Sequence, residues 1–102
     1  MRVAIASTDN KTVNEHFGLA ERFLIYEIGA GALQFVEERP VVPYSDNNPK
    51  HPFDAARFSS VFEAIQDCAR VYVVKIGEKP VAELKARGVE AVVFAGAIAD
   101  IV

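Results

Sequence analysis

Side chains that can bind a transition metal or act as a nucleophile are scarce in this chain. Its 102 residues include one cysteine, Cys68, and two histidines, His16 and His51. A single cysteine excludes an intrachain disulfide, and it excludes any zinc or iron–sulfur site in which one chain supplies four thiolates. A cluster held by this protein would therefore have to span subunits or arrive preformed.

His16 is the candidate metal ligand. An imidazole binds iron as the neutral base, and an unperturbed pKa of about 6.5 keeps the neutral form abundant near neutral pH. Phe17 and Gly18 follow directly, and a glycine lets backbone amides approach a bulky ligand closely. The alternative is that His16 caps a turn or pairs with Asp9 or Glu15, so the residues alone leave both roles open.

The other candidates each have an ordinary explanation beside the functional one. His51, in a proline-rich stretch, either reaches the same site or is simply solvated. Cys68 is either a small buried hydrophobe or a second ligand, although the helix before it should carry it to the opposite end of the sheet. Lys75 and Lys79 could complement an anionic cluster, yet exposed lysines commonly serve only solubility. Asp9 is interpreted as a turn former.

Apolar patterning predicts the strands that must position these residues. Runs rich in β-branched and aromatic residues predict strands over 2–7, 22–28, 32–39, 70–75 and 89–95. The glycines of segment 29–31 suit a hairpin between the second and third strands. Segment 40–52 holds four prolines and several turn-forming residues, so it is expected to be an irregular loop.

Two helices are expected between the later strands. One apolar stripe predicts a helix over 55–67, with Asp54 as its N-cap. A second helix should have Pro80 in its first turn and Gly88 as its left-handed C-terminal cap. Residues 97–102 could begin a further helix.

The element order predicts an α/β topology. The first three strands are joined by short connections and should form an antiparallel meander, whereas each of the last two follows a helix and should lie parallel to the first strand. We therefore predict a single domain over residues 1–102. It would contain a mixed five-stranded sheet in the order 3-2-1-4-5, with strand 2 antiparallel to the rest and helices packed on the sheet.

One edge of this sheet should collect the candidate residues, because the first, third, fourth and fifth strands point the same way. The segments that meet there are 8–20, 40–52, 76–79 and 95–97. They would bring together His16, His51, Lys50, Lys75, Lys79 and Arg57. In a protein of net charge −3, such a gathering of cations suggests a bound anion. We expect a crevice between the first and fourth strands, whose connections leave toward opposite sides.

Several segments resemble a known family. The first three are 3–9 (VAIASTD), 13–18 (VNEHFG) and 23–27 (FLIYE). They are similar to the dinitrogenase iron–molybdenum cofactor-binding family, which includes small nitrogenase accessory proteins and the C-terminal domain of the cofactor-biosynthesis protein NifB. The resemblance continues through 67–69, 75–77 and 84–89. The His-Phe-Gly triplet between two strands is its most specific part.

The resemblance implies a ribonuclease-H-like α/β fold and a carrier or chaperone, not a catalyst. Its cargo would be an iron–molybdenum cofactor, a precursor or a related iron–sulfur cluster, exchanged with cofactor-biosynthesis or nitrogenase proteins in nitrogen fixation or a related pathway. By this likeness His16 matches the family's histidine implicated in cluster binding. The expected cofactor-binding set is His16, Phe17, Gly18, His51 and Lys75, with His16 as the metal ligand. Ligation by one group also permits release, which a carrier requires.

Charge and hydropathy argue against several other classes. A net charge of −3 leaves no footprint of a general nucleic-acid binder. No apolar run approaches the roughly 18 to 20 residues of a membrane span. The apolar stretch at the N-terminus is too short for a signal peptide. We therefore expect a cytoplasmic protein with neither nucleic acid nor membrane as a partner.

Two other functions stay open. A metal-dependent hydrolase or nuclease on the same fold would need converging carboxylates that hold two cations and orient water. The acids near the predicted edge are Asp9, Glu15, Asp46, Asp54 and Glu78, and no paired spacing stands out among them. A non-catalytic interaction module would retain the fold without binding a cluster, and the sequence does not separate this function from the carrier.

Overall fold

Strands and helices form largely where the apolar patterning predicted them. The computed structural model describes residues 1–43 and 55–102. The strands of the main sheet are β1 (Arg2–Ile5), β3 (Arg22–Gly29), β4 (Ala32–Pro40), β5 (Arg70–Val73) and β6 (Glu90–Val93). The remaining elements are α1 (Ala55–Ile65), α2 (Glu78–Ala86), the short strands β2 (Thr12–Val13) and β7 (Gly96–Ala97), and 3₁₀ turns at Phe17–Leu19 and Ile98–Ile101.

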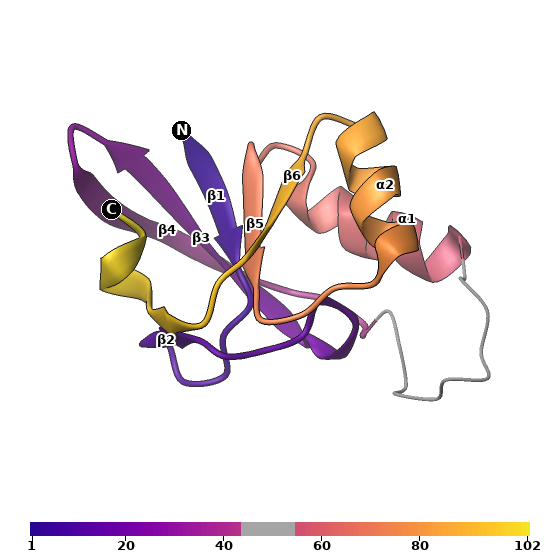
Figure 1. Ribbon diagram of the computed structural model, residues 1–102, viewed down its shortest axis with the longest axis horizontal. Coiled ribbons are helices and arrows are strands. Elements are labelled where there is room, and N and C mark those ends of the chain that lie inside the picture. Colours follow the sequence, from indigo (N-terminus) through magenta and orange to yellow (C-terminus); the bar gives the residue numbers. More distant parts are fainter. Residues whose placement is uncertain (44–54) are drawn as a thin grey trace.

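The main sheet has the order β4-β3-β1-β5-β6 (Figure 1). β3 runs antiparallel to β1 and to β4, whereas β5 is parallel to β1 and to β6. The predicted order and strand directions are therefore confirmed. Ala30 and Gly31 join β3 to β4 with φ angles of 52° and 75°, the left-handed pair that a two-residue hairpin requires. Helices instead precede β5 and β6, and such crossovers lead to parallel strands.

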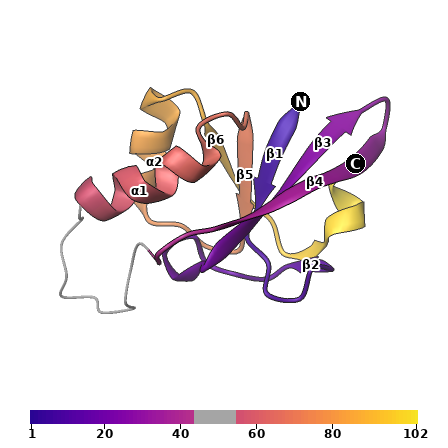
Figure 2. The ribbon, with the colours of Figure 1, turned by 180° about the vertical axis from the view of Figure 1, so that it is seen from behind.

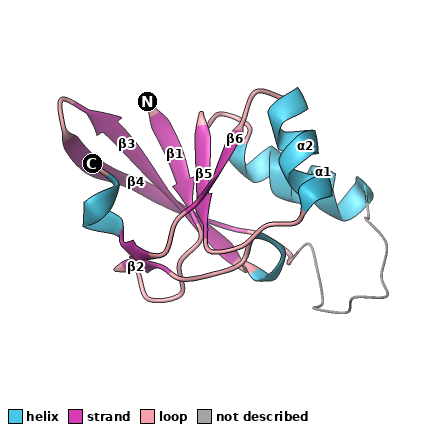
Figure 3. Cartoon of the chain, viewed as in Figure 1, coloured by secondary structure: helices cyan, strands magenta, loops and turns pink. Residues whose placement is uncertain are grey.

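The two faces of the sheet are covered differently. α1 and α2 lie together on one side of it (Figures 2 and 3), where Phe58 of α1 and Leu84 of α2 are fully buried. The opposite face is covered by the β2–β7 sheet and the C-terminal 3₁₀ turn. Val13, Ile98 and Tyr72 form part of this second apolar cluster. None of the helices in the two described ranges is long and apolar enough to cross a bilayer.

Some features differ from the expectations. The pairing of β2 with β7 was not predicted, because two-residue strands have no measurable periodicity. Residues 97–102 were expected to begin a helix, and they contain the 3₁₀ turn Ile98–Ile101 instead. The strands expected to reach residues 7 and 75 end at Ile5 and Val73. After Ile5 and after Val73 the chain leaves the regular strand pairing and forms the loops described below.

The predicted C-terminal cap of α2 is confirmed. Gly88 has a φ of 86°, which a residue without a side chain adopts at little cost. Pro80 lies in the first turn of α2, where its missing N–H is not needed. Asp54, the predicted N-cap of α1, lies outside the described residues.

Candidate functional site

Asp9 organises the turn that follows β1. Its Oδ1 accepts hydrogen bonds from the backbone N–H groups of Lys11 (2.9 Å) and Thr12 (2.8 Å), and its Oδ2 accepts one from the Thr12 hydroxyl (2.8 Å). Buried Ser7 donates to Oδ1 as well. These bonds, first of all those from the backbone, favour the charged form and hold the Asp9 pKa well below its usual range. The prediction that Asp9 forms a turn is confirmed, and its carboxylate is occupied within the loop.

A narrow neck closes this loop. The side-chain amide of Asn14 accepts from the Thr8 N–H through Oδ1 and donates to the Thr8 hydroxyl through Nδ2, both at 2.8 Å. The backbone N–H groups of Asn14 and Glu15 both donate to the Ala6 carbonyl at 3.3 Å. We call Ala6, Thr8, Asn14 and Glu15 the neck. The chain that leaves β1 therefore returns within hydrogen-bonding distance of the same strand.

His16 lies directly after the neck, in the lane that β1 would occupy if it continued. It forms an isolated parallel bridge with Lys75, just beyond β5. The Phe17 N–H donates to the Lys75 carbonyl (2.9 Å), and the Val74 N–H donates to the Glu15 carbonyl (3.0 Å). Register partners present their side chains on the same side of a sheet. The fold thus brings together His16, which is half-buried, and Lys75, which is exposed.

Phe17 anchors His16 to the core. Its side chain is 1% exposed, and its ring centroid lies 6.1 Å from that of Phe23 and 6.3 Å from that of Phe58. The aromatic side chain is thus buried among other rings and is not on the surface that a ligand would meet. Gly18 is half-buried within the 3₁₀ turn that follows His16. The backbone at His16 is consequently held from both sides, by the neck and by the core.

The remaining predicted site residues are spread over the same end of the sheet or lie outside the described residues. Lys79 is in the first turn of α2 and pairs with Glu83 at 3.5 Å. Arg57 is exposed in the first turn of α1. His51 and Lys50 belong to residues 44–54, which the structure does not describe. Among the predicted residues, the structure places His16 and Lys75 next to each other.

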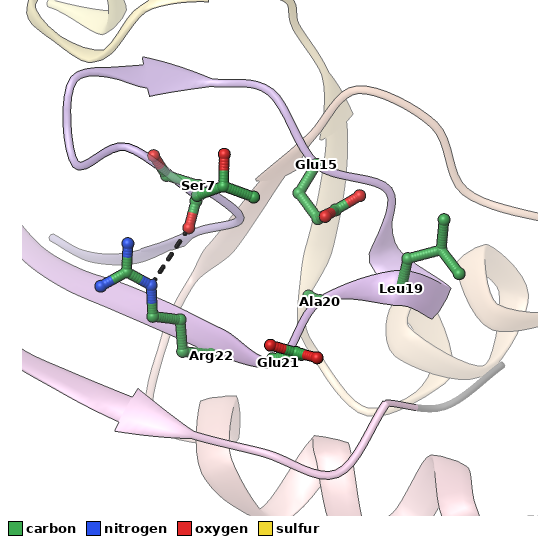
Figure 4. A pocket seen from close by; sticks show the side chains of 7 residues that line it. Ser7, Glu15, Leu19, Ala20, Glu21 and Arg22 are labelled. Atoms are coloured by element: carbon green, nitrogen blue, oxygen red, sulfur yellow. Dashed lines mark hydrogen bonds between the residues drawn. The ribbon is translucent and has the colours of Figure 1, made fainter. Parts of the chain in front are cut away.

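The crevice was expected between the first and fourth strands, and in the described part of the chain the segment 15–17 lies beside the end of β5 at that place. A pocket of about 330 Å³ opens beside this segment, between the Asp9 turn and the start of β3 (Figure 4). It is lined by Ser7, Thr8, Glu15, Leu19, Ala20, Glu21 and Arg22. The Arg22 Nε donates to the Ser7 carbonyl at 3.3 Å and its Nη1 to Glu38 at 2.8 Å. Two carboxylates and one guanidinium line the pocket, so its walls do not favour an anion.

Sequence reasoning missed this pocket because its residues belong to different elements. In the sequence, Glu21 and Arg22 stand at the polar start of one predicted strand, whereas Ser7 is the polar end of another. Their proximity depends on the antiparallel pairing of β1 with β3, which sets the end of one strand beside the start of the other. The pocket could have been anticipated from the polar residues that end the first predicted strand and begin the second, because these two strands were predicted to pair antiparallel.

Cys68 is separate from this end of the sheet. It lies just before β5, is 3% exposed, and is the free cysteine of the chain. Burial, assisted by the adjacent Asp67 carboxylate, raises the Cys68 pKa to about 12. The thiol therefore stays protonated near neutral pH and packs as a small hydrophobe. In the described ranges, no group of three or more histidine, cysteine, aspartate and glutamate side chains is arranged to hold a metal ion.

Comparison with protein families gives one match over the whole chain. The family described as "Dinitrogenase iron-molybdenum cofactor" matches residues 1–102. The FeMo cofactor biosynthesis protein NifB of Frankia alni is 38% identical over 90 residues, which cover 88% of this chain and 18% of that protein. Protein NifX of Sinorhizobium fredii is 33% identical over 78 residues, covering 76% of this chain and 49% of NifX. The chain thus spans about a fifth of NifB and about half of NifX.

Two solved structures are similar in fold. The crystal structure of PH0822 has a TM-score of 0.72 and 26% identity, and the match covers 99% of this chain and 86% of that one. An NMR structure of a Thermotoga protein has a TM-score of 0.59 and 24% identity, covering 95% and 79%. Both similarities support the mixed α/β architecture.

Proposed function

This chain belongs to the dinitrogenase iron–molybdenum cofactor family, as its motifs predicted, and we propose that it is a carrier of a preformed metallocluster. The cargo would be the iron–molybdenum cofactor, a precursor of it or a related iron–sulfur cluster. Its donor and acceptor would be proteins of cofactor biosynthesis or nitrogenase. The carrier would not be a catalyst, and we assign its sheet to the ribonuclease-H-like type.

The observation that carries this proposal is the backbone placement of His16. Main-chain hydrogen bonds on either side of it, from Phe17 to Lys75 and from Val74 to Glu15, hold the backbone of His16 at the end of the sheet, where its side chain is half-buried. The neutral ring would give one nitrogen lone pair to an iron of the incoming cluster. A preformed cluster brings its own sulfides, so one protein ligand suffices to hold it and one exchange step releases it.

The other residues of the proposed site would have supporting roles. The ammonium of Lys75, in register with His16, would offset negative charge on the cargo. Phe17 would act through its burial, by keeping the His16 backbone in place, and Gly18 by forming the close turn behind it. His51 is proposed as a second contact from the segment 44–54.

Anaerobic mixing of the purified protein with isolated iron–molybdenum cofactor tests the proposal. Iron should comigrate with the protein in gel filtration, and the complex should absorb in the visible region. His16→Ala removes the proposed ligand and should abolish stable comigration of iron, whereas Lys75→Ala should weaken binding by about threefold, in a salt-dependent way. Lys11→Ala is the matched control, because Lys11 is an exposed lysine of the preceding loop that is not in register with His16.

The outcomes separate the alternatives. Equal binding by His16→Ala and the parent would refute the ligand assignment. A folded parent that binds no cluster but captures a protein partner would favour the interaction module. Hydrolytic activity is not favoured by the Asp9 carboxylate, whose two oxygens accept hydrogen bonds from their own turn.

A further inference from the structure

The neck lies between two segments that are held independently of each other. On one side, the loop body is stabilised by Asp9 and by the pairing of β2 with β7. On the other side, His16 and Phe17 are bound to Lys75 and to the core. Asn14 is the neck residue whose side chain, as well as its backbone, bonds across the neck.

Asn14 makes the shorter contacts in the neck. Its two side-chain hydrogen bonds to Thr8 measure 2.8 Å, whereas the two backbone bonds to the shared Ala6 carbonyl measure 3.3 Å. A primary amide carries an acceptor and a donor at one end, so a single side chain satisfies both the N–H and the hydroxyl of Thr8. Asn14 and Thr8 are both exposed, so their pairing adds little to the apolar core.

We propose that Asn14 is a positioning residue for His16: by clamping Thr8 it sets the point at which the chain re-enters the lane of β1, and so fixes the imidazole for the cargo. This inference rests on the proposed function. Without the clamp, Glu15 and His16 keep their partners beside β5, and the two 3.3 Å backbone bonds to Ala6 remain, but the two shorter contacts to Thr8 are lost. The bridge to Lys75 should then open more often, and a ligand held by one imidazole should leave faster.

Three variants remove two, one or none of the contacts between residues 14 and 8. Asn14→Ala removes both contacts to Thr8. Thr8→Val removes the contact to the hydroxyl and keeps the backbone N–H. Asn14→Asp keeps both contacts, because the carboxylate accepts from the Thr8 N–H and from the Thr8 hydroxyl, which then acts as the donor. Thr12→Val is the matched control, since it is the same substitution in the same loop and also removes one 2.8 Å side-chain bond, the one to Asp9.

Hydrogen exchange gives a readout that does not depend on cargo. The amides of Phe17 and Val74, which pair the His16 segment with the end of β5, should exchange about tenfold faster in Asn14→Ala. They should exchange at the parental rate in Asn14→Asp and in Thr12→Val. Equal exchange in Asn14→Ala and the parent would overturn the proposal, as would equal acceleration in Thr12→Val.

Cargo release is the second measurement. The parent, loaded with isolated iron–molybdenum cofactor, is challenged with an excess of a competing thiol ligand, and the iron that stays with the protein in rapid gel filtration is measured over time. Release should be about five- to tenfold faster from Asn14→Ala, intermediate from Thr8→Val, and parental from Asn14→Asp and Thr12→Val. Parental release from Asn14→Ala would refute the positioning role while the carrier function stands. A parent that binds no cofactor would refute the carrier function and this role together.

Discussion

The helix-covered core and the loop that presents His16 are stabilised by different forces. In the core, Phe58, Ile65 and Leu84 are fully buried, so apolar burial supplies the free energy of folding. In the loop, exposed polar residues such as Asp9 and Asn14 hold the chain through directed hydrogen bonds. Among the described residues, no buried side-chain nitrogen or oxygen lacks a partner. The difference indicates that stability and ligand geometry are separable in this protein.

Truncation in the core should have the largest effect on stability. Phe58 is 1% exposed and contacts the Phe17 and Phe62 rings, so Phe58→Ala should lower the free energy of unfolding by about 3–5 kcal/mol. Phe35→Ala is the control, because Phe35 is 54% exposed. Its cost should stay below about 1 kcal/mol. Urea unfolding of both variants measures the contrast, and a loss in Phe58→Ala as small as the one expected for Phe35→Ala would contradict the core role of Phe58.

An ionic cluster connects the core to the strands and should give a smaller, pH-dependent effect. Asp67, after α1, accepts from Arg39 at 2.6 Å and from Arg2 at 2.9 Å. These bonds, that of Arg39 first, hold the Asp67 pKa well below its usual range. Asp67→Asn should cost about 1 kcal/mol at neutral pH, because partial exposure lets water screen the pairs. Glu63→Gln, an exposed position of α1, serves as the control.

The pH dependence follows from the direction of the pKa shift. A carboxyl group whose pKa is lower in the folded state stabilises the protein at pH values above its unfolded pKa, and this contribution is lost as the pH falls below about 4. The parent should therefore lose stability in acid more steeply than Asp67→Asn. Urea unfolding at a series of pH values measures both slopes, and parallel slopes would contradict the role of Asp67.

In the loop, Asp9→Asn should have a local effect. An asparagine can keep its oxygen on the N–H groups of Lys11 and Thr12 but loses the charge that strengthens those bonds. The amides of Lys11 and Thr12 should exchange faster with solvent, while the amides of β5 and β6 keep their parental rates. Asp100→Asn, an exposed change of the same charge, should alter neither set. Uniform acceleration through the sheet would show that the loop and the core unfold together.

His16→Ala should have the smallest effect on stability. The side chain is half-buried, and the segment is held by backbone bonds that alanine retains, so the free energy of unfolding should change by less than about 0.5 kcal/mol. Cluster binding should fall sharply in the same variant. Thermal or urea unfolding beside the binding assay checks the separation. A loss comparable to that of Phe58→Ala would place His16 in the structural framework instead.

The sheet was predictable because its connections carry strong local signals. The Ala30–Gly31 turn favours a hairpin, and the apolar stripe of α1 favours a helix, so the order of the strands followed. Burial of Cys68 was one of two predicted alternatives, based on how commonly free cysteines are buried, and the structure shows it buried. The position of His16 beside the end of β5 was not predicted, because the turn after β1 and the neck consist largely of polar residues without periodicity.

By itself, the amino-acid sequence determined the family, the order and direction of the five main strands, and the choice of His16 as the candidate ligand. Only the tertiary structure decided where His16 lies: in the continuation of β1, paired with Lys75, directly after the neck. The physical reason is that main-chain hydrogen bonds between distant segments leave no mark on side-chain patterns. These hydrogen bonds depend on how the loop closes and on which backbone N–H and C=O groups at the end of β5 are not already paired with β1.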